Sequence, residues 1–198
     1  FDSSTKFGEN NRTGFFPAAS VAWRLSQENF LKNSETISDL KLRVSYGLTG
    51  NDDISPFLYS ELYSTTVYGG APGIYPSNIP NPDLKWEAIN PLSLGIDAGL
   101  FNNRLTFTAE YYNKKTTDLV FSQPLSLSQG LASMDRNIGS LVNKGWEFAV
   151  NGEIISTENL SWELGGNFST LDNEITKLYG GADIISGSTI LREGESVG

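Results

Sequence analysis

A strict two-residue alternation of apolar and polar side chains is the feature that most constrains the fold of this chain. Successive side chains of a β-strand point to opposite faces, so the alternation predicts strands with one apolar face and one polar face. In residues 40–48 every second side chain is apolar, and the positions between them hold Lys41, Arg43, Ser45 and Gly47. The same pattern recurs in residues 92–100, 105–112 and 160–169, and more weakly in 15–25 and 146–150. These runs predict an all-β fold.

The dipeptide Asn102-Asn103 lies between two of these runs and predicts how the two strands pair. A two-residue hairpin loop fixes the register of both strands, so that Leu100 faces Leu105 and Ala98 faces Phe107. The apolar phases of the two strands then meet each other, and so do the polar phases. An antiparallel hairpin is therefore predicted.

The links between the predicted strands alternate in length. The shorter links are 25–40, 102–103 and 152–159, and the long ones are 49–91, 113–145 and the tail after Thr170. The long links are rich in Gly, Pro, Asn, Ser and Tyr, which is a loop composition. Membrane barrels join their strands by short periplasmic turns and long extracellular loops. The alternation of link lengths predicts an antiparallel up-and-down transmembrane sheet.

Two folds are compatible with the alternation alone, because a membrane-facing sheet and a soluble β-sandwich both need one apolar face. The predicted strands approach the roughly 9 to 11 residues of a membrane-spanning strand, whereas soluble strands average about 5 to 6. Aromatic side chains near the strand ends suit the membrane interface. They are Trp23, Tyr111, Tyr112, Trp146 and Trp162. These features favour the membrane, and the alternative is a soluble or surface-anchored carbohydrate-binding β-sandwich.

Composition argues against several functional classes. With 14 Lys and Arg against 23 Asp and Glu, the net charge of −9 disfavours binding to nucleic acid, whose affinity rests on basic side chains. The chain has no Cys and no His, which removes thiolate chemistry and the commonest general base and metal ligand. Asp52-Asp53 lacks the spaced oxygen ligands of a calcium loop, so a solvated turn is expected. Neither a metal nor a cofactor is predicted.

Carboxylates in the polar phase of the predicted strands are the remaining candidates for catalysis. They are Asp97, Glu110, Glu147 and Glu163. Paired carboxylates can hydrolyse glycosides, but on the water-facing side of a barrel such groups ordinarily pair with bases such as Lys41, Arg43 or Arg104, or contact water. No catalytic residue is predicted, and the chain is not expected to be an enzyme.

Several runs resemble, in order, the barrel of SusC/RagA-family TonB-dependent outer-membrane proteins. They are Lys6-Phe7-Gly8-Glu9-Asn10-Asn11-Arg12 with Gly14 to Arg24, Ser38 to Asn51, Asn81-Pro82-Asp83-Leu84-Lys85-Trp86-Glu87, Leu100 to Leu105, Tyr111 to Leu119, and Asn137 to Glu147. The resemblance spans essentially the whole chain. It implies an all-β, antiparallel up-and-down transmembrane β-barrel segment, with about six or more long strands of a barrel of about 22.

The resemblance also implies a function. Residues 1–198 are expected to be part of a TonB-dependent receptor β-barrel domain, without the plug domain, the TonB box or a signal peptide. The parent would import oligosaccharides or peptides across the outer membrane of a Gram-negative bacterium. Its expected partners are a SusD-like surface lipoprotein that caps the barrel, the TonB complex and outer-membrane lipid.

Aromatic side chains in the expected extracellular loops are the candidates for ligand binding. They are Tyr59, Tyr63, Tyr68, Tyr75 and Trp86. Their flat faces and polar edges can stack on sugars or hold peptides, or they can pack loop against loop. On the same assignment, Arg at Val44 or Ile96 would face lipid, whereas Arg at Gly95 would be tolerated if the lumen has room.

Overall fold

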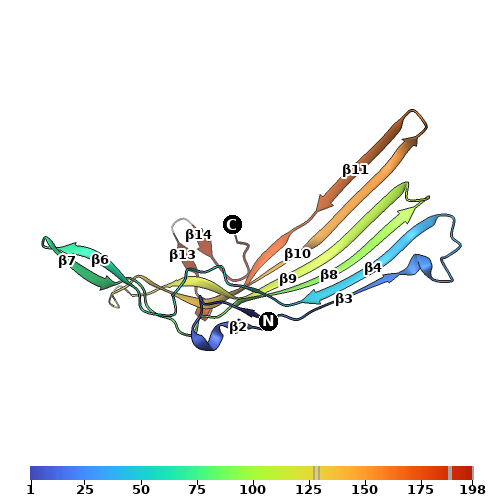
Figure 1. Ribbon diagram of the computed structural model, residues 1–198. Coiled ribbons are helices and arrows are strands. Elements are labelled where there is room, and N and C mark those ends of the chain that lie inside the picture. The colour runs from blue at the N-terminus through green and yellow to red at the C-terminus, as the bar shows by residue number, and fades with distance from the viewer. Residues whose placement is uncertain (127, 129, 187–188, 198) are drawn as a thin grey trace.

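One antiparallel sheet dominates the computed structural model, which describes residues 1–126, 128, 130–186 and 189–197 (Figure 1). Its strands follow the order β3, β4, β8, β9, β10, β11, so that the chain runs up and down across the sheet. Their bounds are β3 (Ala18–Arg24), β4 (Ile37–Gly47), β8 (Glu87–Leu100), β9 (Leu105–Pro124), β10 (Ser133–Ser156) and β11 (Ser161–Ser169). This architecture confirms the predicted all-β, up-and-down sheet.

Shorter elements gather at one end of this sheet. Strand β5 (Thr49–Asn51) pairs with β8, and β12 (Asp172–Lys177) pairs with β10. Three separate ladders join β1 (Asp2–Ser3) to β2 (Thr13–Gly14), β6 (Tyr63–Tyr68) to β7 (Ala71–Pro76), and β13 (Ile184–Ser186) to β14 (Thr189–Leu191). The 3-10 turns are η1 (Glu9–Asn11), η2 (Leu25–Gln27) and η4 (Tyr179–Gly181). Among the described residues, no helix is long and apolar enough to cross a membrane.

The two ends of the main sheet differ in their connections. At one end lie the links 25–36, 101–104 and 157–160, and we call this the turn end. At the other end lie both termini and the hairpins β6–β7 and β13–β14, and we call this the loop end (Figure 1). Short links at one end and long ones at the other agree with the sequence-based expectation.

The main sheet has one apolar face and one polar face, as the alternation predicts. Directly opposed residues form rows across the strands, and one row joins Trp23, Leu42, Ile96, Ala109, Phe148 and Phe168. This apolar face is widely exposed in the chain: Val21 is 71% and Phe168 63% exposed. The opposite, polar face carries Lys41, Arg43, Asp97, Thr108, Glu110, Glu147 and Asn167.

The buried side chains lie at the loop end rather than on the apolar face of the main sheet. Phe7 and Leu84 are fully buried, and Ile175 and Leu178 pack with Ile184 into a small core beside β9 and β10. A sandwich would cover its apolar face with a second sheet. Within the described residues no sheet covers this face, so the sandwich alternative is wrong.

The hairpin between β8 and β9 has the predicted register. Leu100 faces Leu105, and Ala98 faces Phe107. Asn102 and Asn103 have φ of 59° and 63°, and the Arg104 N–H donates to the Phe101 carbonyl at 3.2 Å. Two consecutive positive φ values are what a type I′ turn requires, and Asn tolerates them better than most residues.

The predicted long links contain more ordered structure than expected. Strands β9 and β10 are 20 and 24 residues long and stay paired up to Pro124 and Ser133, so only residues 125–132 connect them. The expected loop 113–145 is therefore largely a ladder, and the expected link 49–91 contains β5, β6, β7 and the start of β8. The alternation of apolar and polar residues is lost in these segments, while the backbone pairing of β9 and β10 persists to Pro124 and Ser133.

Candidate functional site

The segment 81–87 lies at the centre of the loop end and joins parts of the chain that are distant in sequence. The Asn81 side chain is 7% exposed, donates to the Asp135 carbonyl at 2.8 Å and accepts from the Asp83 N–H at 3.2 Å. The latter bond is an Asx-type turn, which allows the chain to reverse before β8. Leu84 then enters the buried core.

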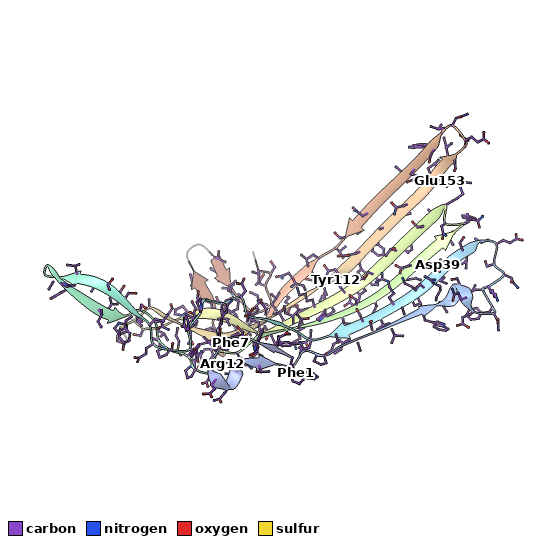
Figure 2. All side chains as sticks on the ribbon, in the orientation of Figure 1. Phe1, Phe7, Arg12, Asp39, Tyr112 and Glu153 are labelled. Atoms are coloured by element: carbon purple, nitrogen blue, oxygen red, sulfur yellow. The ribbon has the colours of Figure 1, made fainter. Side chains whose placement is uncertain are left out.

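Trp86 and Glu87 continue this arrangement. The Trp86 indole lies 5.3 Å from each of the Phe7 and Phe16 rings, and its N–H donates to the Arg12 carbonyl at 3.2 Å. Figure 2 places Phe7 and Arg12 at the loop end. One Glu87 oxygen accepts from Asn51 Nδ2 at 2.6 Å, and the other accepts from the Val120 N–H at 2.9 Å. The segment therefore holds the N-terminal residues, β5 and β9 together.

Asn137 completes the connection from the side of β10. Its Nδ2 donates to the carbonyls of Lys85 and Asp118, at 2.8 and 2.7 Å, and its Oδ1 accepts from the Lys85 N–H at 3.0 Å. Lys85 also forms an ion pair with Asp118 at 3.0 Å. We call Asn81, Lys85, Trp86, Glu87 and Asn137 the staple. Several of the runs that resemble the SusC/RagA pattern thus meet in space, which the sequence alone did not reveal.

Glycines in the same runs allow close packing. A Cβ atom on Gly14 or Gly50 would lie 2.3 or 2.1 Å from the Phe16 ring, so this ring rests directly on both backbones. A Cβ atom on Gly145 would lie 2.0 Å from the Thr170 carbonyl oxygen. These positions need glycine because another backbone or ring occupies the space of a side chain.

The predicted ligand-binding aromatics fall into two groups. Tyr63, Tyr68 and Tyr75 lie on the β6–β7 hairpin and are 57%, 87% and 47% exposed, and Tyr59 lies just before this hairpin, 6.4 Å from Phe57. Trp86 lies in the staple instead, where its ring and N–H are already used. The hairpin pairs only with itself, so its tyrosines are the available ones among the described residues.

The tyrosines of the hairpin do not form one clamp. Tyr68 and Ser64 share a face, and Tyr75 lies opposite Ser64, so Tyr68 and Tyr75 are separated by about 13 Å along the ladder at the usual strand rise. Tyr63 is on the other face, where its hydroxyl donates to Glu61 at 2.8 Å. This hydrogen bond to a carboxylate raises the pKa of Tyr63 above its ordinary value.

Two of the four candidate carboxylates of the polar face, Asp97 and Glu110, are paired with bases. Asp97 binds Lys41 at 3.1 Å and Arg43 at 2.8 Å, and Arg43 also reaches Glu110 at 3.2 Å. The expected pairing with Lys41 and Arg43 is confirmed, and Arg104 lies 3.9 Å from Glu153. Each of the other two lies opposite another carboxylate: Glu147 is opposite Glu110, and Glu163 is opposite Glu153.

Arg43 also corrects one expectation from the sequence. A Cβ atom on Gly95 would lie 2.9 Å from Arg43 Cζ, because the guanidinium lies flat across this glycine to reach Asp97 and Glu110. The end of the Arg43 side chain already occupies the space beside Gly95 and would have to move to admit another side chain. A charge there would displace the ion network, so Ser45 is the better polar-face position for comparison with Val44.

Asp53 is exposed, as expected of a solvated turn, whereas Asp52 is partly buried and held by its neighbours. Ser4 Oγ donates to Asp52 Oδ2 at 2.7 Å, and Lys6 Nζ donates to the Asp52 carbonyl at 2.8 Å. In the part of the chain that the structure describes, no group of three or more His, Cys, Asp or Glu is arranged to hold a metal ion.

Comparison with known proteins decides what this sheet is part of. Residues 1–192 match the family model described as TonB dependent receptor-like, beta-barrel. The chain belongs to this family. TonB-dependent receptor P3 of Formosa agariphila is 40% identical over 211 residues, which cover 100% of the chain and 21% of that receptor. TonB-dependent receptor SusC of Bacteroides thetaiotaomicron is 38% identical over 192 residues, which cover 92% of the chain and 19% of SusC.

A solved structure shows the same arrangement. A chain of the RagAB peptide transporter superposes on this TonB-dependent receptor segment with a TM-score of 0.89 at 32% identity, over 97% of the segment and 22% of that chain. The segment spans about a fifth of the length of the curated relatives it matches. It is therefore a sector of a larger barrel, and the resemblance to SusC/RagA proteins is confirmed.

Proposed function

We propose that this segment forms a sector of the wall and of the external mouth of a TonB-dependent importer in the outer membrane of a Gram-negative bacterium. The apolar face lies against lipid, the polar face lines the lumen, and the loop end faces the outside. One observation carries this proposal: a single sheet leaves a broad apolar face exposed and has short links at one end and long ones at the other.

The imported substrate is an oligosaccharide or a peptide, and a SusD-like surface lipoprotein caps the loop end. Support for this comes from the relatives, which include SusC and the RagAB peptide transporter. The exposed Tyr68 and Tyr75 of the β6–β7 hairpin offer rings for stacking on a sugar or packing on a peptide. The TonB complex acts on parts of the parent outside this segment.

In this role the segment forms a fixed wall and rim around the transport path. The staple joins the N-terminal residues, β5, β8, β9 and β10 into one rim, so the mouth keeps its shape while other parts of the importer move. The ion network of Lys41, Arg43, Asp97 and Glu110 keeps the polar face hydrated and rigid. No chemical step is required of these residues.

The orientation is tested by cysteine labelling of the parent receptor, made free of other cysteines, in intact cells. A membrane-impermeant maleimide should label Thr66→Cys on the β6–β7 hairpin at once. It should label Asn103→Cys at the turn end only after the outer membrane is permeabilised. Labelling of both positions, or only of Asn103→Cys, in intact cells would contradict the proposed topology.

The substrate class is tested separately by binding of fluorescent oligosaccharides and peptides to the purified parent. Tyr68→Ala should weaken binding of the true substrate class by roughly threefold to tenfold, because a stacking ring contributes on the order of 1 kcal/mol. Thr66→Ala, on the same face of the hairpin, is the control and should bind as the unchanged receptor does. Equal affinities in both variants would remove Tyr68 from the ligand site.

A further inference from the structure

The β6–β7 hairpin has two outer edges that differ in their backbone chemistry. The hairpin extends away from the main sheet at the loop end (Figure 1), and among the described residues β6 pairs only with β7. Its turn at Gly69-Gly70 has φ of 60° and 86° and joins the opposed residues Tyr68 and Ala71. Each strand therefore has one edge that faces its partner and one edge that faces away.

The hydrogen-bonding phase of the hairpin follows from its base. The Ser77 N–H donates to the Leu62 carbonyl at 2.8 Å, and these two residues continue the register in which Tyr63 faces Pro76. In an antiparallel ladder, hydrogen-bonded pairs alternate with pairs whose N–H and C=O groups point outward. The outward pairs are Tyr63 with Pro76, Thr65 with Ile74, and Val67 with Pro72.

The outer edge of β7 is closed by prolines. Pro72 and Pro76 occupy two of its three outward positions, and proline has no N–H to donate. Proline on an edge strand protects that edge against pairing with another chain. Ile74 alone keeps an outward N–H on this edge, so an incoming strand would find one donor in place of three.

The outer edge of β6 has no such protection. Tyr63, Thr65 and Val67 each direct an N–H and a carbonyl outward, over about 13 Å at the usual strand rise. The only charged side chain in residues 54–82 is Glu61, which lies before β6. An uncharged edge with free donors and acceptors can pair with an extended backbone.

The two faces of the hairpin also differ. The face that belongs to the outward pairs carries Tyr63, Thr65, Val67, Pro72, Ile74 and Pro76. It is apolar and uncovered, since Val67 is 72% and Ile74 73% exposed. The opposite face carries Ser64, Thr66, Ala71 and Gly73 between Tyr68 and Tyr75. A strand added to β6 is therefore favoured when every second side chain is apolar and lies on the first of these faces.

We propose that the outer edge of β6 binds an imported peptide in extended form, as an additional antiparallel strand of the hairpin. This inference rests on the proposed function and narrows its substrate class to peptides. A row of N–H and C=O groups at strand spacing matches a peptide backbone, whereas an oligosaccharide has no such repeat. Because main-chain hydrogen bonds carry the binding, peptides of many sequences fit. A permanent protein partner would bury about 800 Å² on each side, more than this short edge offers.

The receptor side is tested with the full-length parent and a fluorescent, end-blocked peptide of about eight residues that alternates valine and threonine. Thr65→Pro removes the central outward N–H, and the proline ring keeps the incoming strand away, so binding should weaken by about tenfold. Ile74→Pro, at the directly opposed position, is the matched control. It alters the edge already closed by prolines and should leave binding unchanged. Thr65→Val keeps the N–H and should also bind normally.

The peptide side is tested with the unchanged receptor, so that a folding defect cannot explain the result. In antiparallel pairing, the peptide residue opposite Thr65 directs its N–H toward β6 and its side chain onto the apolar face. N-methylation of every valine should therefore abolish binding. N-methylation of every threonine gives an isomeric peptide whose methyl groups point away from β6, and it should bind within about twofold of the parent peptide.

Two kinds of result would overturn the proposal. The first is equal binding of the two methylated peptides, or equal binding of the peptide by the Thr65→Pro and Ile74→Pro receptors. The second is a Thr65→Pro receptor that keeps the peptide but loses a surface lipoprotein or a second receptor copy in native mass spectrometry. That outcome would assign the edge of β6 to a permanent partner.

A failure of this inference can be told apart from a failure of the proposed function. If the cysteine labelling supports the topology and the unchanged receptor binds oligosaccharides but not the peptide, then only the peptide site is wrong. If the labelling places Asn103→Cys outside and Thr66→Cys inside, the hairpin does not face the incoming substrate. The proposed orientation and the peptide site then fail together.

Discussion

At the scale of single residues, the most constrained positions are those where two backbones or a ring and a backbone touch. Gly145 faces the Thr170 carbonyl, and Gly14 and Gly50 lie under the Phe16 ring. Gly166 on the neighbouring strand β11, in contrast, has open space where a side chain would be. A glycine in a strand is therefore informative only when the structure shows what replaces its side chain.

Gly145→Ala should lower the stability of the parent receptor by roughly 1 to 3 kcal/mol, because the new methyl group meets the Thr170 carbonyl and must displace the start of β12. Gly166→Ala on β11 is the matched control and should be neutral or slightly stabilising. Urea unfolding in detergent, followed by heat-modifiable migration on gels, measures both. Equal midpoints for the two variants would mean that the β11–β12 junction relaxes freely.

Val44 and Ser45 are adjacent residues of β4 whose side chains point to opposite faces of the main sheet. Val44→Arg should cost roughly 2 to 4 kcal/mol where the apolar face meets lipid, whereas Ser45→Arg should cost little on the polar side. The folded fraction of each receptor variant in lipid vesicles, titrated with urea, gives the difference. Equal tolerance at the two positions would refute the assignment of faces.

At the scale of elements, the β8–β9 hairpin shows how local chemistry determines pairing. Its register follows from a turn in which Asn102 and Asn103 both have positive φ. Phe101 also has φ of 54°, a conformation that costs a bulky residue more than it costs Asn. The turn accepts this strain because the long apolar phases on either side pair correctly.

Asn103→Val should destabilise this hairpin by about 1 to 2 kcal/mol, because a β-branched residue at φ near 63° brings its Cβ against the following carbonyl. Asn103→Gly should preserve stability, since glycine adopts this conformation freely. Folding yield and urea midpoint of the parent measure both variants. A Val variant as stable as the Gly variant would show that the turn has moved to another register.

Strands can be predicted from the sequence where the two faces of the main sheet have different surroundings, one apolar and one aqueous. Between Leu40 and Leu48, and between Leu92 and Leu100, one face of the strand must be apolar and the other polar. Every second residue is therefore apolar, and the strand and its register can be deduced from the sequence. Beyond Tyr112 both sides of β9 are polar or protein-covered, and the alternation disappears although pairing continues to Pro124. The staple was not predictable, because Asn137 and Lys85 are 52 residues apart and neither residue type signals its partner. The ligand role of the hairpin tyrosines stays a prediction.

At the scale of the whole molecule, the wall and the mouth are stabilised in different ways. The wall relies on backbone pairing and on lipid to cover its apolar face, whereas the mouth has its own buried core and side-chain hydrogen bonds to distant backbone groups. The two regions join along β9 and β10, which run through both. A defect in the mouth should therefore leave the barrel inserted.

Asn137→Ala removes three hydrogen bonds between β10, Lys85 and Asp118, and it should loosen the loop end by roughly 1 to 3 kcal/mol. Trypsin should then cleave the receptor after Lys85 about ten times faster, while heat-modifiable migration of the barrel stays normal. Asn167→Ala, on the polar face of β11, is the control and should leave cleavage unchanged. Equal cleavage rates would show that the staple is dispensable.

Hydrogen bonds close the base of the β6–β7 hairpin and make it a self-contained unit. Asn78 accepts from the Leu62 N–H at 2.7 Å and donates to the Ser60 carbonyl at 3.0 Å, while the Ser77 N–H donates to the Leu62 carbonyl at 2.8 Å. Beyond these hydrogen bonds, the hairpin pairs with no other strand in the part of the chain that the structure describes. We therefore expect that residues 60–78 can be transplanted between related receptors as a unit, which would transfer the proposed ligand contacts of the hairpin while the wall that carries it stays unchanged.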